Sequence, residues 1–195
     1  MTNDLIIVSA QNRAIGRAEK RAVHEAGLLH RAFSIFLVDR ESRVLLQRRH
    51  PGKYHSGGLW ANSCCGHPQP GERTLGAARR RLREELGVTA ALRFGFLARY
   101  RAAVSDRLKE NEIVYIYFGL VPGNIQPNPT EISSIAMRTL EEIIRETGRK
   151  PEAYAFWLRY YLAHHAAQVA QGIDGVLRRT GSKITDQAAS IAAAT

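Results

Sequence analysis

The sequence predicts a mixed β-sheet packed between helices, an α/β (α+β) fold with one main domain. Short, β-rich apolar segments recur along the chain, and helical segments stand between and after them. No internal repeat occurs at any period. The 195 residues, 45% of them hydrophobic and 24% charged, are enough to bury a core without disulfides. Intrinsic disorder of the whole chain is therefore excluded.

The first half of the chain predicts four strands. The segment Leu5–Ala10 is apolar enough to be the first strand. Two β-rich segments, Ala32–Val38 and Arg43–Arg49, flank a four-residue polar turn and predict a hairpin. A loop rich in proline and glycine follows at 51–58. It leads to a short predicted strand, Leu59–Ser63.

The best-defined element is a helix predicted over Glu72–Leu86. Four apolar residues fall at offsets of three, four and four, and they form one stripe along the helix: Leu75, Ala78, Leu82 and Leu86. Gly87 follows directly, which is typical of a helix C-terminus.

The second half predicts two more strands and two helices. The strands are Leu92–Tyr100 and Glu112–Leu120, joined by a polar turn. The stretch 124–130 contains two prolines and is expected to be a loop. A short helix is expected at Leu140–Glu146, and a longer one at Glu152–Gln171.

We expect the domain to cover residues 1–175 and the Ala-rich residues 176–195 to form a partly disordered tail. The two cysteines, Cys64 and Cys65, are adjacent, and adjacent cysteines rarely form a disulfide because of strain. A reducing compartment fits this composition. The N-terminus does not resemble a signal peptide, and the longest apolar stretch is too short to cross a bilayer. A cytoplasmic protein without membrane attachment is expected.

The formal net charge of +10 is confined to the first half of the chain. Residues 1–101 contain 18 basic and 8 acidic side chains, whereas residues 102–195 contain ten of each. An evenly basic, histone-like surface is therefore disfavoured, and a local site for an anion is favoured.

The most specific motif begins at Gly66. Glu72 follows it after five intervening residues. After seven more intervening residues comes the cluster Arg80-Arg81-Leu82-Arg83-Glu84-Glu85-Leu86-Gly87-Val88. This pattern resembles the Nudix box, which ends in Arg-Glu-apolar-x-Glu-Glu-x-Gly-apolar. One fixed position differs, because Arg81 stands where the box has the first glutamate of its final cluster.

The carboxylates of the Nudix box bind metal ions, and Arg81 changes this metal-binding capacity. Clustered carboxylates on one helix bind a hard divalent cation, which in turn binds a diphosphate. Arg81 and Glu85 are four residues apart and share a helix face. A cation in place of a metal-facing carboxylate weakens a hydrolytic site with several metals, but it can contact phosphate oxygens directly. The simpler alternative is an exposed helix with ion pairs such as Arg80–Glu84.

A second group of residues has the chemistry of a transition-metal site. Glu110 and Glu112 are two apart on a predicted strand, so they point to the same side. Two adjacent carboxylates need a cation or a shared proton. Three histidines lie on segments that can meet this pair: His24, His30 and His67. Three imidazoles and two carboxylates would suit Mn, Zn or Fe.

Together these motifs resemble type 1 isopentenyl-diphosphate isomerase, a divergent branch of the Nudix fold. Asn62–Pro68 matches its Asn-Ser-x-Cys-Gly-His-Pro motif, and Glu110–Glu112 matches its acidic motif. His30–Ser34 matches the entry to its first hairpin, and Tyr100-Arg101 precedes the acidic motif as in the family. Ala155–Trp157 matches the region of its active-site tryptophan. The resemblance implies a Nudix-type mixed β-sheet sandwiched between helices, in a branch that does not hydrolyse diphosphates.

The resemblance implies an enzyme that interconverts isopentenyl diphosphate and dimethylallyl diphosphate in isoprenoid biosynthesis. An unactivated alkene is a poor base, so protonation needs a strong acid in a dry site, and a second group must then remove a proton. The family assigns these transfers to Cys65 and Glu112, usually with Glu112, assisted by Tyr100, as the acid. Sequence alone leaves the order open. Trp157 is expected to stabilise the carbocation through its indole face, with Trp60 as the competing candidate.

The resemblance also implies two metal sites and a set of phosphate-binding cations. Mn²⁺ or another divalent ion has five expected ligands: His24, His30, His67, Glu110 and Glu112. Mg²⁺ accompanies the diphosphate and is expected on Glu85 and the carbonyl of Cys65. The diphosphate itself is expected to bind four basic residues: Lys20, Arg49, Lys53 and Arg81. Arg48 should point away from Arg49, and Cys64 should pack in the core.

Two other functions stay open at this point. A Nudix hydrolase of nucleoside diphosphate derivatives would share the fold, but it should keep a full acidic box and has no need of Cys65 with Glu112. A nucleic-acid binder is favoured only by the high pI of 10.1. The basic residues are scattered and no nucleic-acid motif occurs. We expect a small diphosphate as the partner and no nucleic acid, and a monomer and a dimer are both open.

Overall fold

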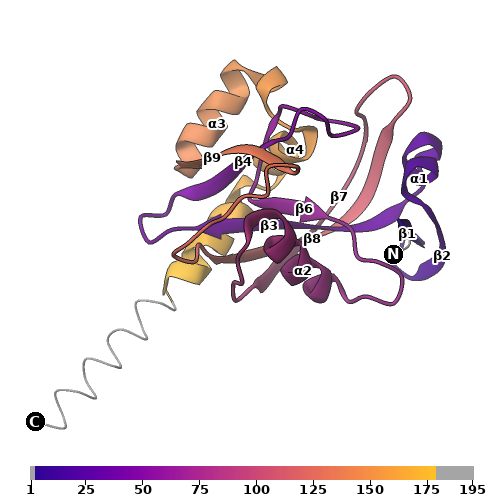
Figure 1. Cartoon of the computed structure of the whole chain (residues 1–195), viewed down its shortest axis with the longest axis horizontal. Coiled ribbons are helices and arrows are strands. Elements are labelled where there is room, and N and C mark those ends of the chain that lie inside the picture. The colour runs from indigo at the N-terminus through magenta and orange to yellow at the C-terminus, as the bar shows by residue number, and fades with distance from the viewer. Residues whose placement is uncertain (1–2, 179–195) are drawn as a thin grey trace, which may run out of the picture.

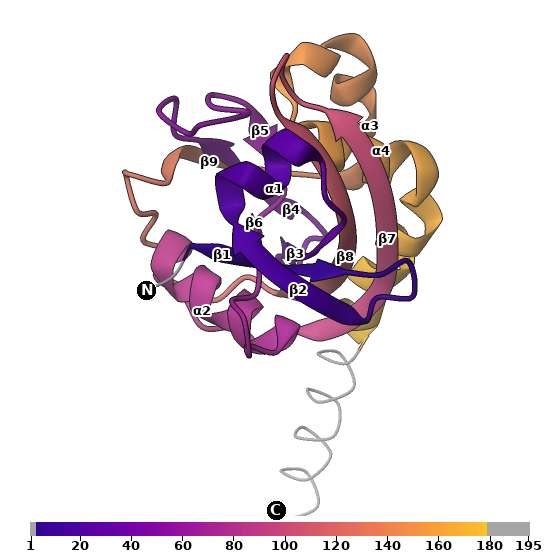
Figure 2. The same ribbon diagram turned by 90° about the vertical axis from the view of Figure 1, so that its right-hand side faces the viewer.

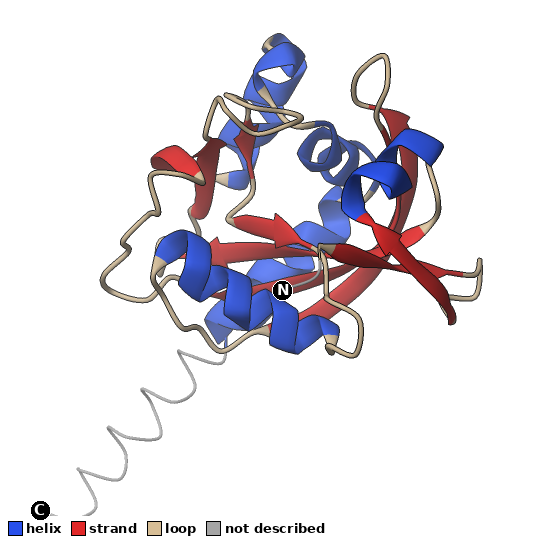
Figure 3. Cartoon of the chain, turned by 45° about the vertical axis from the view of Figure 1, so that its right-hand side comes forward, coloured by secondary structure: helices blue, strands red, loops and turns tan. Residues whose placement is uncertain are grey.

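The computed structural model describes residues 3–178; residues 1–2 and 179–195 lie outside the described part. The chain forms a mixed sheet of nine strands (Figures 1 and 3): β1 (Asp4–Val8), β2 (Ala14–Glu19), β3 (His30–Val38), β4 (Val44–Arg49), β5 (Trp60–Ala61), β6 (Cys64–Gly66), β7 (Arg93–Ala103), β8 (Lys109–Leu120) and β9 (Ile132–Arg138). The helical elements are α1 (Lys20–Ala26), α2 (Thr74–Leu86), α3 (Leu140–Arg149), the 3-10 turn η1 (Pro151–Ala153), α4 (Phe156–His164) and a last helix over 166–178.

Helices cover both faces of the sheet, which confirms the predicted fold class (Figure 1). Alternate residues of β3 point to opposite faces. Phe33 packs with α2 residues such as Leu82 on one face. Phe36 packs with α4 residues such as Tyr161, and with the last helix, on the other face. Each face therefore has its own apolar core, and β3 lies buried between them.

The register around β3 aligns residues that lie far apart in the sequence. β3 runs parallel to β8, with His30 opposite Glu112. β7 runs antiparallel to β8 on its other side, with Tyr100 also opposite Glu112. β6 pairs with β3 and sets Cys65 opposite Ser34. Four strands, β3, β6, β7 and β8, thus bring polar side chains together near the start of β3.

The helix that carries most of the cluster Arg80–Val88 agrees with its prediction except at its first turn. α2 begins at Thr74 rather than Glu72. Glu72 remains outside the helix, where its carboxylate accepts a hydrogen bond from the Gln69 N–H and pairs with Arg80. The predicted stripe faces the core, and Gly87 ends the helix with a φ of 67°, a conformation that glycine adopts without strain.

Several elements differ from the sequence prediction. The two strands of the predicted hairpin, β3 and β4, pair with each other only beside the turn, where Val38 lies opposite Val44. Beyond that point β4 pairs with β5 and β9 instead. The basic segment after β1 forms the exposed strand β2 and the short helix α1, neither of which was predicted. The predicted helix Glu152–Gln171 is interrupted, since α4 ends at His164 and a new helix begins at residue 166.

The last helix passes the predicted domain boundary. Residues 166–178 are helical across position 175, and Val176 is buried in the core beside α4. The rest of the predicted Ala-rich tail, residues 179–195, lies outside the described residues. Over residues 3–178, none of the helices combines the length and apolar character that a membrane span requires.

Candidate active site

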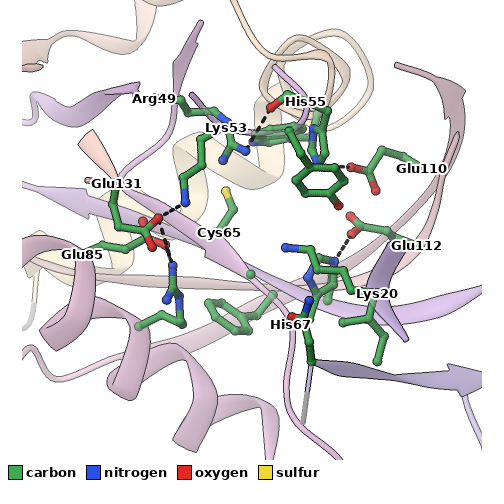
Figure 4. Close-up of a pocket in the computed structure, with 18 of the residues that line it drawn as sticks. Lys20, Arg49, Lys53, His55, Cys65, His67, Glu85, Glu110, Glu112 and Glu131 are labelled. Atoms are coloured by element: carbon green, nitrogen blue, oxygen red, sulfur yellow. Dashed lines mark hydrogen bonds and ion pairs between the residues drawn. The ribbon is translucent and has the colours of Figure 1, made fainter. Parts of the chain in front are cut away.

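A cavity of about 330 Å³ opens at the end of the sheet where α1 approaches β8 (Figure 4). In Figure 2 this end of the sheet, with α1 in front, faces the viewer. Eleven of the predicted site residues line it: Lys20, Arg49, Lys53, Cys65, His67, Arg81, Glu85, Tyr100, Glu110, Glu112 and Trp157. His24 and His30 are fully buried behind His67, with ring centroids 5.6 and 5.0 Å from its ring. The structure therefore brings all thirteen predicted residues together.

Glu112 is bound by partners on both of its carboxylate oxygens. The Tyr100 hydroxyl donates to Oε2 at 2.5 Å. His67 Nε2 lies 2.8 Å from Oε1, and His30 Nε2 lies 3.2 Å from the same oxygen. Burial alone would raise the pKa of Glu112, but its interactions with His30 and His67 outweigh burial and hold this pKa well below its usual range. The resting carboxylate is therefore ionised.

The buried histidines have the orientation of metal ligands. His24 Nδ1 lies 2.6 Å from the Lys20 carbonyl, and His30 Nδ1 lies 2.9 Å from the Leu28 carbonyl. A carbonyl only accepts, so each Nδ1 carries the proton and each Nε2 is left with a lone pair that faces a carboxylate. His30 Nε2 and Glu110 Oε2 are buried atoms without a hydrogen-bond partner among the described residues.

A cation satisfies this arrangement, because two facing acceptors repel unless a proton or a metal ion lies between them. Burial opposes a proton on His30, yet the close contact with the charged Glu112 outweighs burial and raises the pKa of His30. Burial and the charge of Glu112 likewise raise the pKa of Glu110. The donor set of imidazoles and carboxylates fits a divalent transition metal.

The histidines and carboxylates form two overlapping groups. Four residues can offer donor atoms within 4.8 Å of one another: His24, His30, His67 and Glu112. Glu110 belongs instead to a second group that meets the same limit: His24, His55 and Glu110. The predicted set of five ligands is thus divided, and a residue that was not predicted, His55, joins Glu110.

Cys65 lies between the histidine–glutamate cluster and the cationic end of the cavity (Figure 4). Its thiol donates to Asn62 Oδ1 at 3.3 Å, and the Ser34 hydroxyl lies 3.1 Å from the sulfur. Asn62 is itself fixed by donating to Ser34 and to the Ile35 carbonyl. Burial raises the pKa of Cys65 to about 12, so the thiol is neutral. Cys64 points into the core beneath α2, as expected.

The indole of Trp157 lines the cavity and already contacts a cation. The Arg49 guanidinium lies 5.2 Å from the ring centroid, a cation–π distance. Trp157 is only 4% exposed, and its Nε1 has no partner among the described residues. Trp60 is not among the lining residues; it packs against the core on the α4 side. Placement therefore favours Trp157 over Trp60.

The opposite end of the cavity is cationic. Burial lowers the pKa of Lys53 at this end to about 8; burial also lowers the pKa of Lys20, which lies beside His67 at the histidine–glutamate end (Figure 4). Arg81 contacts Glu85 and Glu84 on its own helix, and its Nη2 lies 3.4 Å from Glu131. Glu131 also pairs with Lys53. These cations can bind an anion, and Glu85, only 5% exposed, can bind a hard cation beside it.

Sequence reasoning missed several charged or titratable residues of the cavity, among them His55 and Glu131. His55 lies in the loop between β4 and β5, and Glu131 lies directly before β9. Neither belongs to a motif of regular spacing. The only available signal was composition: seven histidines in the chain, four of which converge here. Burial lowers the pKa of His55 to about 3, so its imidazole is neutral.

The fold and the carboxylate-bearing helix define a NUDIX-domain protein. A protein-family model described as the NUDIX domain matches residues 28–161. Among solved structures, a protein from Deinococcus radiodurans is similar, with a TM-score of 0.69, 22% identity, and coverage of 82% of this chain and 97% of the other. The MutT protein from Methanosarcina mazei Go1 has a TM-score of 0.58 at 17% identity, covering 69% and 91%. These two similarities concern the fold alone.

Curated relatives give a finer assignment. The isopentenyl-diphosphate Delta-isomerase of Serratia proteamaculans is 49% identical over 157 residues, which are 80% of this chain and 88% of the relative. Isopentenyl-diphosphate Delta-isomerase 2 of Aromatoleum aromaticum is 41% identical over 186 residues, 95% and 98% of the two chains. This chain belongs to the NUDIX family, in the branch of the isopentenyl-diphosphate Delta-isomerases.

Proposed function

We propose that this protein interconverts isopentenyl diphosphate and dimethylallyl diphosphate. One observation supports this function above all: a thiol, Cys65, and a tyrosine-bound carboxylate, Glu112, line a single small cavity that also contains the cations needed for a diphosphate. A hydrolase needs a water-activating acidic cluster, whereas a double-bond shift needs one proton donor and one proton acceptor near the same allylic system.

We assign the two proton transfers to Glu112 and Cys65. In the family pattern Glu112, assisted by Tyr100, donates a proton to the alkene, and Cys65 removes a proton from the neighbouring carbon of the cation. A carboxyl group of low pKa is a strong acid once it holds a proton, as an unactivated alkene requires. For this direction of the reaction Glu112 must hold the proton and Cys65 must be deprotonated. The reaction is reversible, and each group serves as acid in one direction.

Trp157 is the residue we assign to the carbocation. Its π-face stabilises positive charge electrostatically and has no lone pair that would trap the cation. The Arg49 guanidinium already lies over this ring. With the diphosphate bound, Arg49 can pair with phosphate oxygens, while the indole remains the wall nearest the hydrocarbon part of the substrate.

We assign the two metal positions as follows. The histidine–glutamate cluster fits Mn²⁺ or another transition metal, and Glu85, together with the Cys65 carbonyl, fits Mg²⁺ that arrives with the diphosphate. When bound, the first ion holds Glu112 in place and tunes its acidity, and the second neutralises the phosphates. Lys20, Arg49, Lys53 and Arg81 hold the diphosphate, so that the hydrocarbon end lies between Cys65 and Glu112.

Arg81 argues against hydrolysis as the main activity. It occupies the position of a metal-facing glutamate of the Nudix box and pairs with Glu85 and Glu84 on the same helix. Each pair removes negative charge from the cluster that would hold several metals. The site that remains has one buried helix carboxylate, Glu85, beside a cation suited to phosphate oxygens.

The proposal is tested with purified protein, isopentenyl diphosphate, and Mg²⁺ with Mn²⁺. We expect conversion to the acid-labile allylic isomer. Cys65→Ala and Glu112→Gln should each reduce turnover at least about a thousandfold, because each removes a group that transfers a proton. Hydrolysis of nucleoside diphosphate derivatives without isomerisation would contradict the proposal.

A further inference from the structure

His55 is a buried histidine to which the proposed reaction assigns no role. It lies in the loop between β4 and β5, and its side chain is only 6% exposed. Figure 4 shows the imidazole directed at Glu110, with Nε2 3.4 Å from Oε1. The ring also meets the edge of Trp157, at 6.1 Å between centroids. The side chain is therefore directed into the cavity rather than toward solvent.

The surroundings of His55 resemble those of His24. His55 Nδ1 lies 3.2 Å from the Ser56 hydroxyl, which can accept its proton, just as the Lys20 carbonyl accepts from His24 Nδ1. Nε2 of each ring then presents a lone pair to Glu110: His55 to Oε1, and His24 to Oε2 at 3.5 Å. Metal-binding histidines typically have this arrangement, with a second acceptor fixing the other ring nitrogen.

A proton is a poor alternative to a metal ion at this position. The Arg49 guanidinium donates to the His55 carbonyl at 3.3 Å, so a fixed positive charge lies beside the ring. Lys20 is on the same wall of the cavity and contacts the ring of Tyr54, the neighbour of His55. These two basic side chains oppose a third positive charge on the imidazole, and the neutral imidazole is the form that binds metals.

We propose that His55 is a fourth histidine donor of the transition-metal site and binds the ion together with His24 and Glu110. The donor atoms of these three residues lie within 4.8 Å of one another. His24 belongs to both groups of donors, and one nitrogen lone pair binds one ion. An ion bound by His24 and Glu110 therefore lies within reach of His55. A site with four imidazoles selects borderline metals such as Zn²⁺ or Co²⁺ over Mn²⁺, which prefers oxygen donors.

The inference rests on the proposed metal site but not on the isomerase reaction, and it is tested by metal binding in the full chain. Uniformly ¹⁵N-histidine-labelled wild-type protein is titrated with Zn²⁺ and followed by NMR. We expect four Nε2 resonances to shift, those of His24, His30, His55 and His67. The remaining histidines, His50, His164 and His165, are internal controls that should not shift.

A matched pair of variants gives a second readout. His55→Gln should weaken Zn²⁺ binding about 10- to 100-fold, as losses of metal-site partners do, and should change the visible absorption of the Co²⁺ form. Binding of Mn²⁺ should weaken less than about threefold. The control His164→Gln removes an exposed histidine of α4 and should leave both affinities unchanged. The stability of the metal-free proteins, measured by circular dichroism, shows that each variant folds.

The outcomes separate the two proposals. Three shifted Nε2 resonances, or a folded His55→Gln variant with unchanged Zn²⁺ affinity and Co²⁺ spectrum, would overturn the role of His55 and leave the metal site standing. A wild-type protein that binds neither Zn²⁺ nor Mn²⁺ would overturn the proposed metal site and the role of His55 with it.

Discussion

Tyr100→Phe removes one hydrogen bond from the proposed acid and nothing else of comparable size. The Tyr100 hydroxyl donates to Oε2 of Glu112 at 2.5 Å, and the ring is 5% exposed. The two histidines lie on the other oxygen, so Oε2 has no second partner among the described residues. A hydrogen bond to a charged group contributes about 1.5–3 kcal/mol. If this interaction orients and tunes Glu112 during proton transfer, its loss should lower kcat about 10- to 150-fold.

The assay is the rate of formation of the acid-labile product at saturating substrate, with KM measured in parallel. KM should change less than about twofold, because the Tyr100 hydroxyl donates to Glu112 and not to the groups proposed to hold the diphosphate. The control is Tyr160→Phe: the Tyr160 ring lies 5.3 Å from that of Tyr100 between centroids, but its hydroxyl donates to the Arg99 carbonyl outside the cavity. That variant should keep at least half of its kcat. A folded Tyr100→Phe protein with more than half of the wild-type kcat would refute the assisting role.

Three further predictions address the indole, the phosphate cations and the metal. Trp157→Phe should retain more activity than Trp157→Ala, since a phenyl ring still offers a π-face; equal kcat values would contradict the cation–π role. Burial lowers the pKa of Lys53 to about 8, so its ammonium loses charge between pH 7 and 9, and KM should rise about tenfold by pH 9. Lys53→Arg, which stays charged, should abolish that rise, and a flat wild-type KM profile would exclude the role of Lys53. Removal of metal by a chelator should lower the Tm by about 5–10 °C, because an ion present at 100 times its Kd adds about 2.7 kcal/mol of stability. An unchanged Tm in differential scanning calorimetry would speak against a resident ion.

The sequence was most informative where a local rule decides the structure. The stripe of α2 and the glycine that ends it are properties of one contiguous segment, and both were predicted correctly. β2 and β6 could not be found this way, because their residues form strands only by pairing with β1 and β3. The break after α4 was also missed, since the apolar pattern continues through it while the backbone turns at His165, with a φ of −136°.

The candidate site was also predicted only in part: residues of local motifs were found, and contacts between distant segments were not. Motif residues such as Cys65, His67 and Glu112 were named from the sequence because their spacing is fixed. What no spacing reveals is the parallel register that sets His30 beside Glu112 across 82 positions of the chain. His55 and Glu131 enter the cavity from loops whose course depends on the surrounding strands. The roles of His55 and Glu131 follow from contacts with residues far away in the sequence, and only the folded structure shows such contacts.

The central claim, that Cys65 and Glu112 carry out the two proton transfers, is tested most directly by isomerisation in D₂O followed by NMR. Wild-type protein should produce dimethylallyl diphosphate with deuterium in a methyl group, because the alkene carbon that accepts the donor's proton becomes that methyl. Cys65→Ala and Glu112→Gln should give neither product nor deuterium in recovered substrate. Cys64→Ala, a change at the adjacent cysteine buried beneath α2, should retain the reaction. Deuterated product from either folded site variant at a rate within tenfold of wild type would contradict the account.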